Sequence, residues 1–152
     1  HGLFLYDTLI RVPLILYHPT LSGKTNSVPV SLYDVAPTLL EMTRTKNDLS
    51  FHGMSLIDSI RFSHSPNEFS HSFKDVLMQR PIFSALSSGK AALIQKGWKL
   101  FYSHPNCWQL FDLTNDPGET VNAAKTHPEI FKQYKTRLSH WIEQGRRDGF
   151  FR

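Results

Sequence analysis

A short apolar run between two prolines constrains the fold of this chain more than any other segment. Residues 11–19 read RVPLILYHP, with the longest apolar stretch at Val12–Tyr17. A continuous run of this length is typical of a strand buried on both faces in a parallel sheet, as in α/β proteins. It is far shorter than the roughly 20 apolar residues that a bilayer-spanning helix needs, so a membrane span is excluded.

A helix is predicted shortly after this strand. Ser31 is followed three residues later by Asp34, the spacing of a capping box that satisfies free amide groups where a helix starts. The helix should run from about Leu32 to Met42, and Pro37 within it predicts a kink or a late start. A strand, a loop and a helix in this order form half of a doubly wound unit.

The stretch Arg44–Arg80 has a weaker pattern and is rich in Ser, His, Asn and Phe. It contains one short helix candidate, Ser55–Phe62. We interpret the rest as an irregular connection that runs over a larger body, because such long loops are uncommon in small domains.

A second unit is predicted after this connection. Short apolar segments separated by turn residues indicate an antiparallel meander, with strands at Ile82–Leu86, Ala91–Gln95, Trp98–Ser103 and Cys107–Leu113. A final helix should follow, because Thr126 and Glu129 have capping-box spacing, Pro128 suits a first turn and Gly145 is a natural stop. Its apolar stripe from Ile130 to Ile142 should bury against the sheet.

Charge and cysteine content exclude several classes of protein. The 152 residues contain 17 Lys and Arg against 13 Asp and Glu, a net charge of +4. The densest basic patch lies near the C-terminus and consists of Arg146, Arg147 and Arg152. We interpret it as a solvated terminus, because a nucleic-acid or lipid contact usually needs a broader basic face. One cysteine, Cys107, excludes an internal disulfide framework and a cysteine-rich zinc site, and we expect it to be a core cysteine.

The residues by themselves contain no self-sufficient catalytic set. None of the eight histidines forms a pair with metal-binding spacing, and no glycine-rich phosphate loop or G-x-S-x-G motif occurs. The histidines next to Pro or Gly should lie in surface turns: His18, His52, His104 and His127. Lys99 and Arg11 lie beside apolar runs, and we interpret them as packed or paired structural cations.

Four blocks stand in order along the chain: HGLFLYDTLIRVPLIL (His1–Leu16), PVSLYDVAPTLLEM (Pro29–Met42), KGWKLFYS (Lys96–Ser103) and WQLFDLTNDPGETVNAA (Trp108–Ala124). Together they resemble the C-terminal part of the sulfatase family, in the alkaline phosphatase superfamily. Any one block would be weak, but four in register are specific. The resemblance covers nearly the whole chain apart from the variable connection.

The resemblance implies an α/β, alkaline phosphatase-like fold. The chain would be a C-terminal fragment: a strand–helix unit of the main sheet, then a small antiparallel sheet covered by a C-terminal helix. The corresponding division is residues 1–45 for the end of the catalytic domain, 46–80 for the variable connection and 81–152 for the C-terminal subdomain.

The family's chemistry is also specific. Its members hydrolyse sulfate esters with a formylglycine made from a Cys/Ser-x-Pro-x-Arg motif and with a divalent cation, usually calcium, held in part by a Ser-Asp-His/Asn-Gly segment. Neither motif occurs here, so the resemblance implies that both lie in a missing N-terminal part and that this fragment alone is inactive. The implied substrate is a small-molecule or glycan sulfate ester, and the implied compartment is periplasmic, secreted or lysosome-like.

One catalytic residue carries over by resemblance. His1 matches the family's basic residue before the Tyr-Asp turn, which reaches the sulfate or the leaving-group oxygen; its role would be charge stabilisation or proton donation. The alternative is a disordered terminus without function. Four further residues match family positions, and we favour fold maintenance over substrate contact for them: Arg11, Asp34, Trp98 and Asp112.

Two other functions stay open. The same architecture could serve a phosphodiester or phosphonate monoester hydrolase, or the fragment could be a non-catalytic interaction module. The buried-type strand would be unpaired in the isolated chain, so we expect that chain to aggregate or self-associate.

Overall fold

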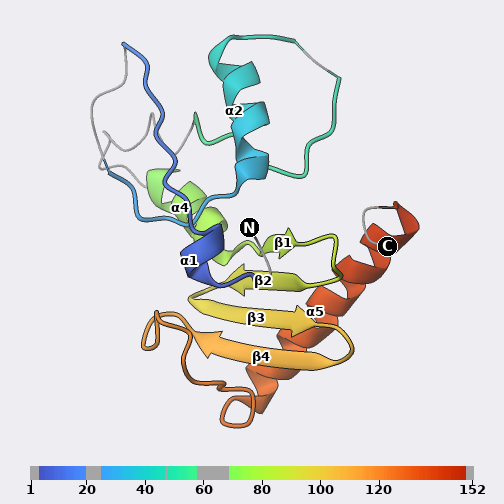
Figure 1. Ribbon diagram of the computed structural model, residues 1–152. Helices are drawn as coiled ribbons and strands as arrows, with labels where there is room; N and C mark the ends of the chain where they lie inside the picture. Colours follow the sequence, from blue (N-terminus) through green and yellow to red (C-terminus); the bar gives the residue numbers. More distant parts are fainter. Residues whose placement is uncertain (1–3, 20–24, 47, 58–68, 150–152) are drawn as a thin grey trace. The chain divides into compact units, whose positions relative to one another are not determined.

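The computed structural model describes residues 4–19, 25–46, 48–57 and 69–149. The chain divides into two compact units, one formed by His1–Leu14 with Pro81–Arg152 and the other by Ile15–Arg80. Figure 1 labels the elements of both units. Among the described residues, no helix is long and apolar enough to cross a bilayer. The three domain boundaries expected from the sequence stay a prediction.

The first unit is built on a four-stranded sheet. Its strands follow one another in the order β1-β2-β3-β4, and every neighbouring pair is antiparallel. Their bounds are β1 Ile82–Ala85, β2 Ala91–Gln95, β3 Trp98–Ser103 and β4 Cys107–Asp112. The predicted meander is confirmed. The tight β2–β3 turn needs positive φ at two successive residues, and Lys96 (48°) and Gly97 (77°) supply it.

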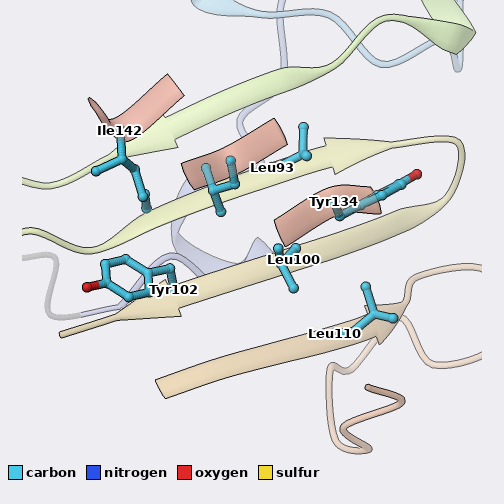
Figure 2. Packing of buried hydrophobic residues seen from close by; sticks show 8 residues of the cluster. Leu93, Leu100, Tyr102, Leu110, Tyr134 and Ile142 are labelled. Carbon is cyan, nitrogen blue, oxygen red and sulfur yellow. The ribbon is translucent and has the colours of Figure 1, made fainter. Parts of the chain in front are cut away.

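Helix α5 (Pro128–Arg147) covers one face of this sheet (Figure 1). Its buried side chains Tyr134, Leu138 and Ile142 belong to one cluster with residues of the strands. Figure 2 shows Tyr134 and Ile142 beside the strands. Leu93 and Leu100 on the facing strands are fully buried. The predicted burial of the helix stripe against the sheet is therefore confirmed, because apolar residues at helical spacing meet apolar residues of alternating strand positions.

Both ends of α5 differ from the prediction. Thr126 makes no capping box; its hydroxyl donates to the Ala123 carbonyl at 3.1 Å, and His127 is the N-cap residue without a side-chain capping bond. Gly145 does not stop the helix but is buried inside it. The helix ends at Arg147. Pro128 does occupy the first turn, as predicted.

The N-terminal segment packs on the residues that β2, β3 and β4 direct away from α5. Leu5 is buried in a second cluster with Ala92, Phe101 and Phe111. The ring of Tyr6 stacks on Phe101, with centroids 5.9 Å apart. Helix α1 (Asp7–Ile10) follows directly. This short segment thus belongs to the same unit as the sheet, although most of the chain separates the two in sequence.

The described part of the second unit contains the 3-10 turn η1 (Leu32–Asp34), which is continued by α2 (Val35–Met42), and the helix α4 (Phe69–Gln79). The predicted capping box at Ser31 is confirmed, since its hydroxyl accepts from the Tyr33 amide and Asp34 accepts from the Ser31 amide. The α-helical part starts late, as Pro37 indicated. Helix α4 lies in the stretch expected to be irregular, which corrects that expectation. Most of the candidate helix Ser55–Phe62 falls outside the described residues.

Two further sequence predictions are wrong in the described structure. The run Val12–Tyr17 is not a strand: none of the described strands pairs with it, and Ile15 and Tyr17 are 86% and 87% exposed. A buried parallel strand requires neighbours on both sides, and hydrophobicity alone does not provide them. Cys107 is exposed at the start of β4 instead of buried, because strand ends leave the core before the turn.

Candidate functional site: two buried ionic centres

The first ionic centre joins the N-terminal segment to the sheet. The Nζ atom of Lys99 lies 3.0 Å from Oδ1 of Asp7 and 2.6 Å from Oε1 of Glu119. The side chain of Lys99 is fully buried and that of Glu119 is 3% exposed, whereas Asp7 is 22% exposed. One cation and two carboxylates therefore share a nearly dry site, in which charge pairing is obligatory.

Lys99 occupies a core position of the sheet. It lies in β3 between Ile94 of β2 and Phe111 of β4, in a strand whose next two residues, Leu100 and Phe101, are also buried. Strand alternation places Lys99 on the same face as Phe101, the face that receives the N-terminal segment. An apolar residue would be expected there. The expectation that Lys99 is a paired structural cation is confirmed.

Glu119 reaches the cluster from a strained turn. Its φ angle of 55° lies in the left-handed region, which is costly for a residue with a side chain. The turn is held by Asp116, whose carboxylate accepts from the Val121 and Thr120 amides; these bonds lower the pKa of Asp116 below 3.8, although its desolvation opposes the shift. Glu119 Oε2 in turn accepts from the Asp7 amide at 2.6 Å. The carboxylate thus binds both the backbone of the N-terminal segment and the lysine.

This centre is suited to anchoring the N-terminal segment on the sheet. A buried, doubly paired ammonium is not available as a nucleophile or a general base, and the cluster contains no histidine or thiol. Within the described ranges, no group of three or more His, Cys, Asp or Glu side chains could hold a metal ion. What the cluster can do is fix α1 and the residues before it on the sheet.

The second ionic centre lies in the other unit, around the fully buried Asp34. Its carboxylate accepts from both terminal nitrogens of Arg80, in a bidentate pair, and from the amides of Ser31 (2.7 Å) and Met54 (2.9 Å). Burial raises the pKa of Asp34, but the hydrogen bonds from Arg80, Met54 and Ser31 outweigh it and hold the pKa below 3.8. Three separate chain segments therefore converge on one carboxylate.

Thr38 extends this centre by one turn of helix. Its buried hydroxyl donates to the Asp34 carbonyl at 2.5 Å and accepts from the Leu56 amide at 2.9 Å. At Gly53 a Cβ atom would lie 2.0 Å from the Tyr33 carbonyl oxygen, so the connection must pass this point without a side chain. The residues around 53–56 are thus bound directly to the start of the helix.

The residues singled out in the sequence fall in different places. His1 lies outside the described residues. Arg11 is exposed just after α1, and Trp98 is half-buried in β3 with its ring 4.7 Å from that of His127. Asp112 closes the turn after β4 by accepting from Asn115 and the Thr114 amide, which lowers its pKa below 3.8. The contacts of Trp98 and Asp112 are structural, and none of the described residues among them meets another in a catalytic arrangement.

Sequence reasoning missed Asp7, Glu119 and Arg80 as ionic partners. Asp7 and Glu119 stood within the quoted Tyr-Asp and Asp-Pro-Gly-Glu motifs, so the signal was present, but which lysine they bind depends on the fold. Arg80 was missed because it is the last residue of the stretch Arg44–Arg80, which was interpreted as irregular.

The comparisons with known proteins now identify the family. The family model described as N-sulphoglucosamine sulphohydrolase, C-terminal, matches residues 2–144. The chain belongs to this family. The sulfatase resemblance of the four sequence blocks is thereby confirmed.

Curated relatives agree along nearly the whole chain. An arylsulfatase of Clostridium perfringens is 28% identical over 95% of this chain and 30% of its own length. Arylsulfatase K of Xenopus laevis is 29% identical over 91% of this chain and 27% of its own length. The chain therefore spans less than a third of these sulfatases and corresponds to their C-terminal portion.

Solved structures support the predicted fold class, which is α/β and alkaline phosphatase-like. The crystal structure of Ps i-CgsB matches with a TM-score of 0.57 and 21% identity, over 76% of this chain and 25% of that chain. The same values hold for Ps i-CgsB in complex with k-i-k-neocarrahexaose. At this identity the likeness establishes the fold alone.

Proposed function

We propose that this chain forms the C-terminal part of a sulfatase that hydrolyses sulfate esters. The observation that carries the proposal is the family match over residues 2–144, which includes all four sequence blocks almost completely. The ionic centres add a physical reason, because Asp7, Lys99 and Glu119 come from three different blocks and meet in one cluster. Three of the four blocks on which the sequence similarity rests therefore meet at one place in this chain.

The proposal assigns the nucleophile and the metal site to sequence other than these 152 residues. A formylglycine needs a Cys/Ser-x-Pro-x-Arg motif, whereas Cys107 is followed by Trp, Gln and Leu. The described residues do not fit a calcium site either, since they hold no cluster of three metal-binding side chains. Calcium and formylglycine thus belong to the proposed N-terminal part.

His1 is the residue of this chain that the proposal places at the reaction. An imidazole can neutralise charge that develops on the sulfate, or give a proton to the departing alkoxide. The support comes from the match of His1 to the basic position before the Tyr-Asp turn. The residues from Phe4 onward are held on the sheet, so His1 stands only three positions before an anchored segment.

The substrate class follows from the relatives. Two of them are named arylsulfatases, and Ps i-CgsB was crystallised with a neocarrahexaose. We therefore propose that the substrate is an aryl or glycan sulfate ester.

The test compares sulfate with phosphorus esters on the protein made from its complete reading frame. We expect turnover of p-nitrophenyl sulfate well above that of bis(p-nitrophenyl) phosphate and p-nitrophenyl phenylphosphonate. A preference for either phosphorus ester would instead identify the phosphodiester or phosphonate hydrolase, and binding without turnover would support the non-catalytic module.

A further inference from the structure

The helical segment formed by η1 and α2 has its polar residues inside and apolar residues outside. Asp34 of η1 and Thr38 of α2 are fully buried, whereas Leu32 and Leu39 are 70% and 48% exposed. A helix at the surface of a globular unit normally directs its apolar residues toward a core and its polar residues toward water. The second unit therefore holds this segment by its polar side.

The polar side already has its partners. The carboxylate of Asp34 binds the guanidinium of Arg80 and the amide of Met54, and the hydroxyl of Thr38 accepts from the Leu56 amide at 2.9 Å. These partners belong to the connection that follows α2 and to the residue that ends the unit. They account for the buried polar side of the segment and leave the opposite side.

The opposite side carries a short apolar stripe that consists of Leu32, Ala36 and Leu39, here called the α2 stripe. Their spacing of four and three positions places them on one side of a helix. All three are exposed in the described structure, and none has a charged or hydrogen-bonding side chain. Apolar side chains gathered on one exposed face mark a contact with another segment or chain.

We propose that the α2 stripe docks onto the N-terminal part of the complete sulfatase, on an apolar surface formed by sequence that precedes these 152 residues. The inference rests on the proposed function, which assigns such a part to the protein. The chain covers only 30% and 27% of the lengths of two curated relatives, and the family model that it matches is a C-terminal one. Most of a sulfatase of this kind is therefore available to cover the stripe.

A second copy of the protein fits the stripe less well. A stable complex of two proteins buries roughly 800 Å² of each partner, because association costs translational and rotational freedom. Three side chains on one side of a short helix supply only a fraction of such an area. A surface in the same polypeptide does not meet this cost, since the covalent connection keeps its effective concentration high. A small stripe is therefore sufficient for docking within one molecule.

The first experiment measures whether the stripe is covered, without using activity. Leu39→Cys and Glu41→Cys are made separately in the protein expressed from its complete reading frame, and maleimide labelling of each new thiol is followed by peptide mass spectrometry. We expect labelling of Leu39→Cys to be at least about 10-fold slower, because a docked side chain reacts only after local opening. Glu41 is the matched control, since it is an exposed residue of the same helix. Where Leu39→Cys does not fold, Ala36→Cys takes its place in the stripe.

The second experiment identifies the occupant. The photoreactive residue p-benzoylphenylalanine replaces Leu32, the more exposed leucine of the stripe, in the complete protein. After irradiation, the crosslinked peptides are identified by mass spectrometry. We expect a crosslink within one molecule to a peptide that precedes the 152 residues. A crosslink between two molecules would identify a second copy, and a crosslink within the 152 residues would identify another part of this chain; either would overturn the proposal.

The outcomes for docking and for catalysis are separate. Equal labelling rates of Leu39→Cys and Glu41→Cys, or of Ala36→Cys and Glu41→Cys where that variant is needed, would overturn the docking of the stripe. Slow labelling in the stripe together with the expected crosslink supports docking. If the same protein shows this result but no turnover of p-nitrophenyl sulfate, the proposed function is contradicted and the docking is still supported.

Discussion

The ammonium group of Lys99 lies 3.0 Å from the carboxylate of Asp7, although 92 positions of sequence separate the two residues. Glu119 closes the cluster, so three of the four family blocks meet at one point of the first unit. The remaining block contains Asp34, which pairs with Arg80 in the second unit. Each of the four blocks therefore contributes one residue to a buried ion pair.

Substitution of Asp34 by Asn should strongly destabilise the second unit. The variant leaves Arg80 without its carboxylate, and breaking a buried ion pair costs about 3–5 kcal/mol. Hydrogen exchange of the segment Ser31–Met42 in increasing urea measures the loss. Asp75→Asn, at an exposed position of α4, is the control and should change the stability by less than about 0.5 kcal/mol.

The cost of losing Asp34 should depend on pH. Because the folded pKa of Asp34 is held below 3.8, its contribution is complete above the unfolded pKa of about 3.9 and is lost as pH falls through the folded value. The difference in urea midpoint between the unsubstituted protein and Asp34→Asn should thus be constant from pH 7 to 5 and shrink below pH 4. A difference that grows on acidification would contradict the assignment.

A methyl group at Gly53 should be far more harmful than one at Gly118. In Gly53→Ala the new Cβ would meet the Tyr33 carbonyl oxygen at 2.0 Å, and backbone cannot yield cheaply. At Gly118 the nearest atom is 3.5 Å away, an ordinary contact. We expect a loss of about 2 kcal/mol or more for Gly53→Ala and nearly none for Gly118→Ala, as judged by urea midpoints. Equal losses of stability in Gly53→Ala and Gly118→Ala would contradict the close approach of Gly53 to the Tyr33 carbonyl group.

Tyr134→Phe should destabilise the first unit by about 1–1.5 kcal/mol, since the buried hydroxyl donates to the Gln95 carbonyl at 2.8 Å. Tryptophan fluorescence reports this unit, because Trp98, Trp108 and Trp141 all lie in it. Burial raises the pKa of Tyr134 above 10.0, so the unfolded state ionises first and stability should fall as pH rises above 10. Tyr134→Phe should lose the part of the fall in stability above pH 10 that ionisation of Tyr134 causes. The same dependence of stability on pH in both proteins would contradict this prediction.

The 152-residue chain expressed alone should self-associate. Several large apolar side chains are exposed in the described structure, among them Val12, Ile15, Tyr17 and Leu32 at 55%, 86%, 87% and 70%. Exposed apolar surface of this kind marks a contact with another chain or segment. Light scattering should detect oligomers or aggregates; a monodisperse monomer with a cooperative melt would contradict the prediction.

Local signals in the sequence were sufficient for the elements that are stabilised locally. The four strands, the Ser31 capping box and the apolar stripe of α5 follow from alternation, turn residues and helical spacing. The end of α5 does not follow from such local signals. Whether a glycine such as Gly145 stops a helix or lies buried inside it depends on the residues that pack against it. The same holds for Cys107, whose exposure is set by its place at a strand end.

The ionic centres required the fold. Lys99 was correctly interpreted as a paired cation, yet its partners lie 92 positions before it and in a turn after β4, and no local pattern gives such distances. The Val12–Tyr17 run illustrates the opposite error. Its composition predicts a buried strand, but burial depends on neighbouring strands that the described residues do not provide.

The sulfatase assignment is tested most directly by turnover of p-nitrophenyl sulfate by the protein made from its complete reading frame, measured beside the 152-residue chain alone. We predict sulfate-ester hydrolysis by the complete protein, loss of most of that activity in His1→Ala, and none in the isolated chain. Turnover by the isolated chain, or a complete protein that cleaves phosphorus esters but no sulfate ester, would contradict it.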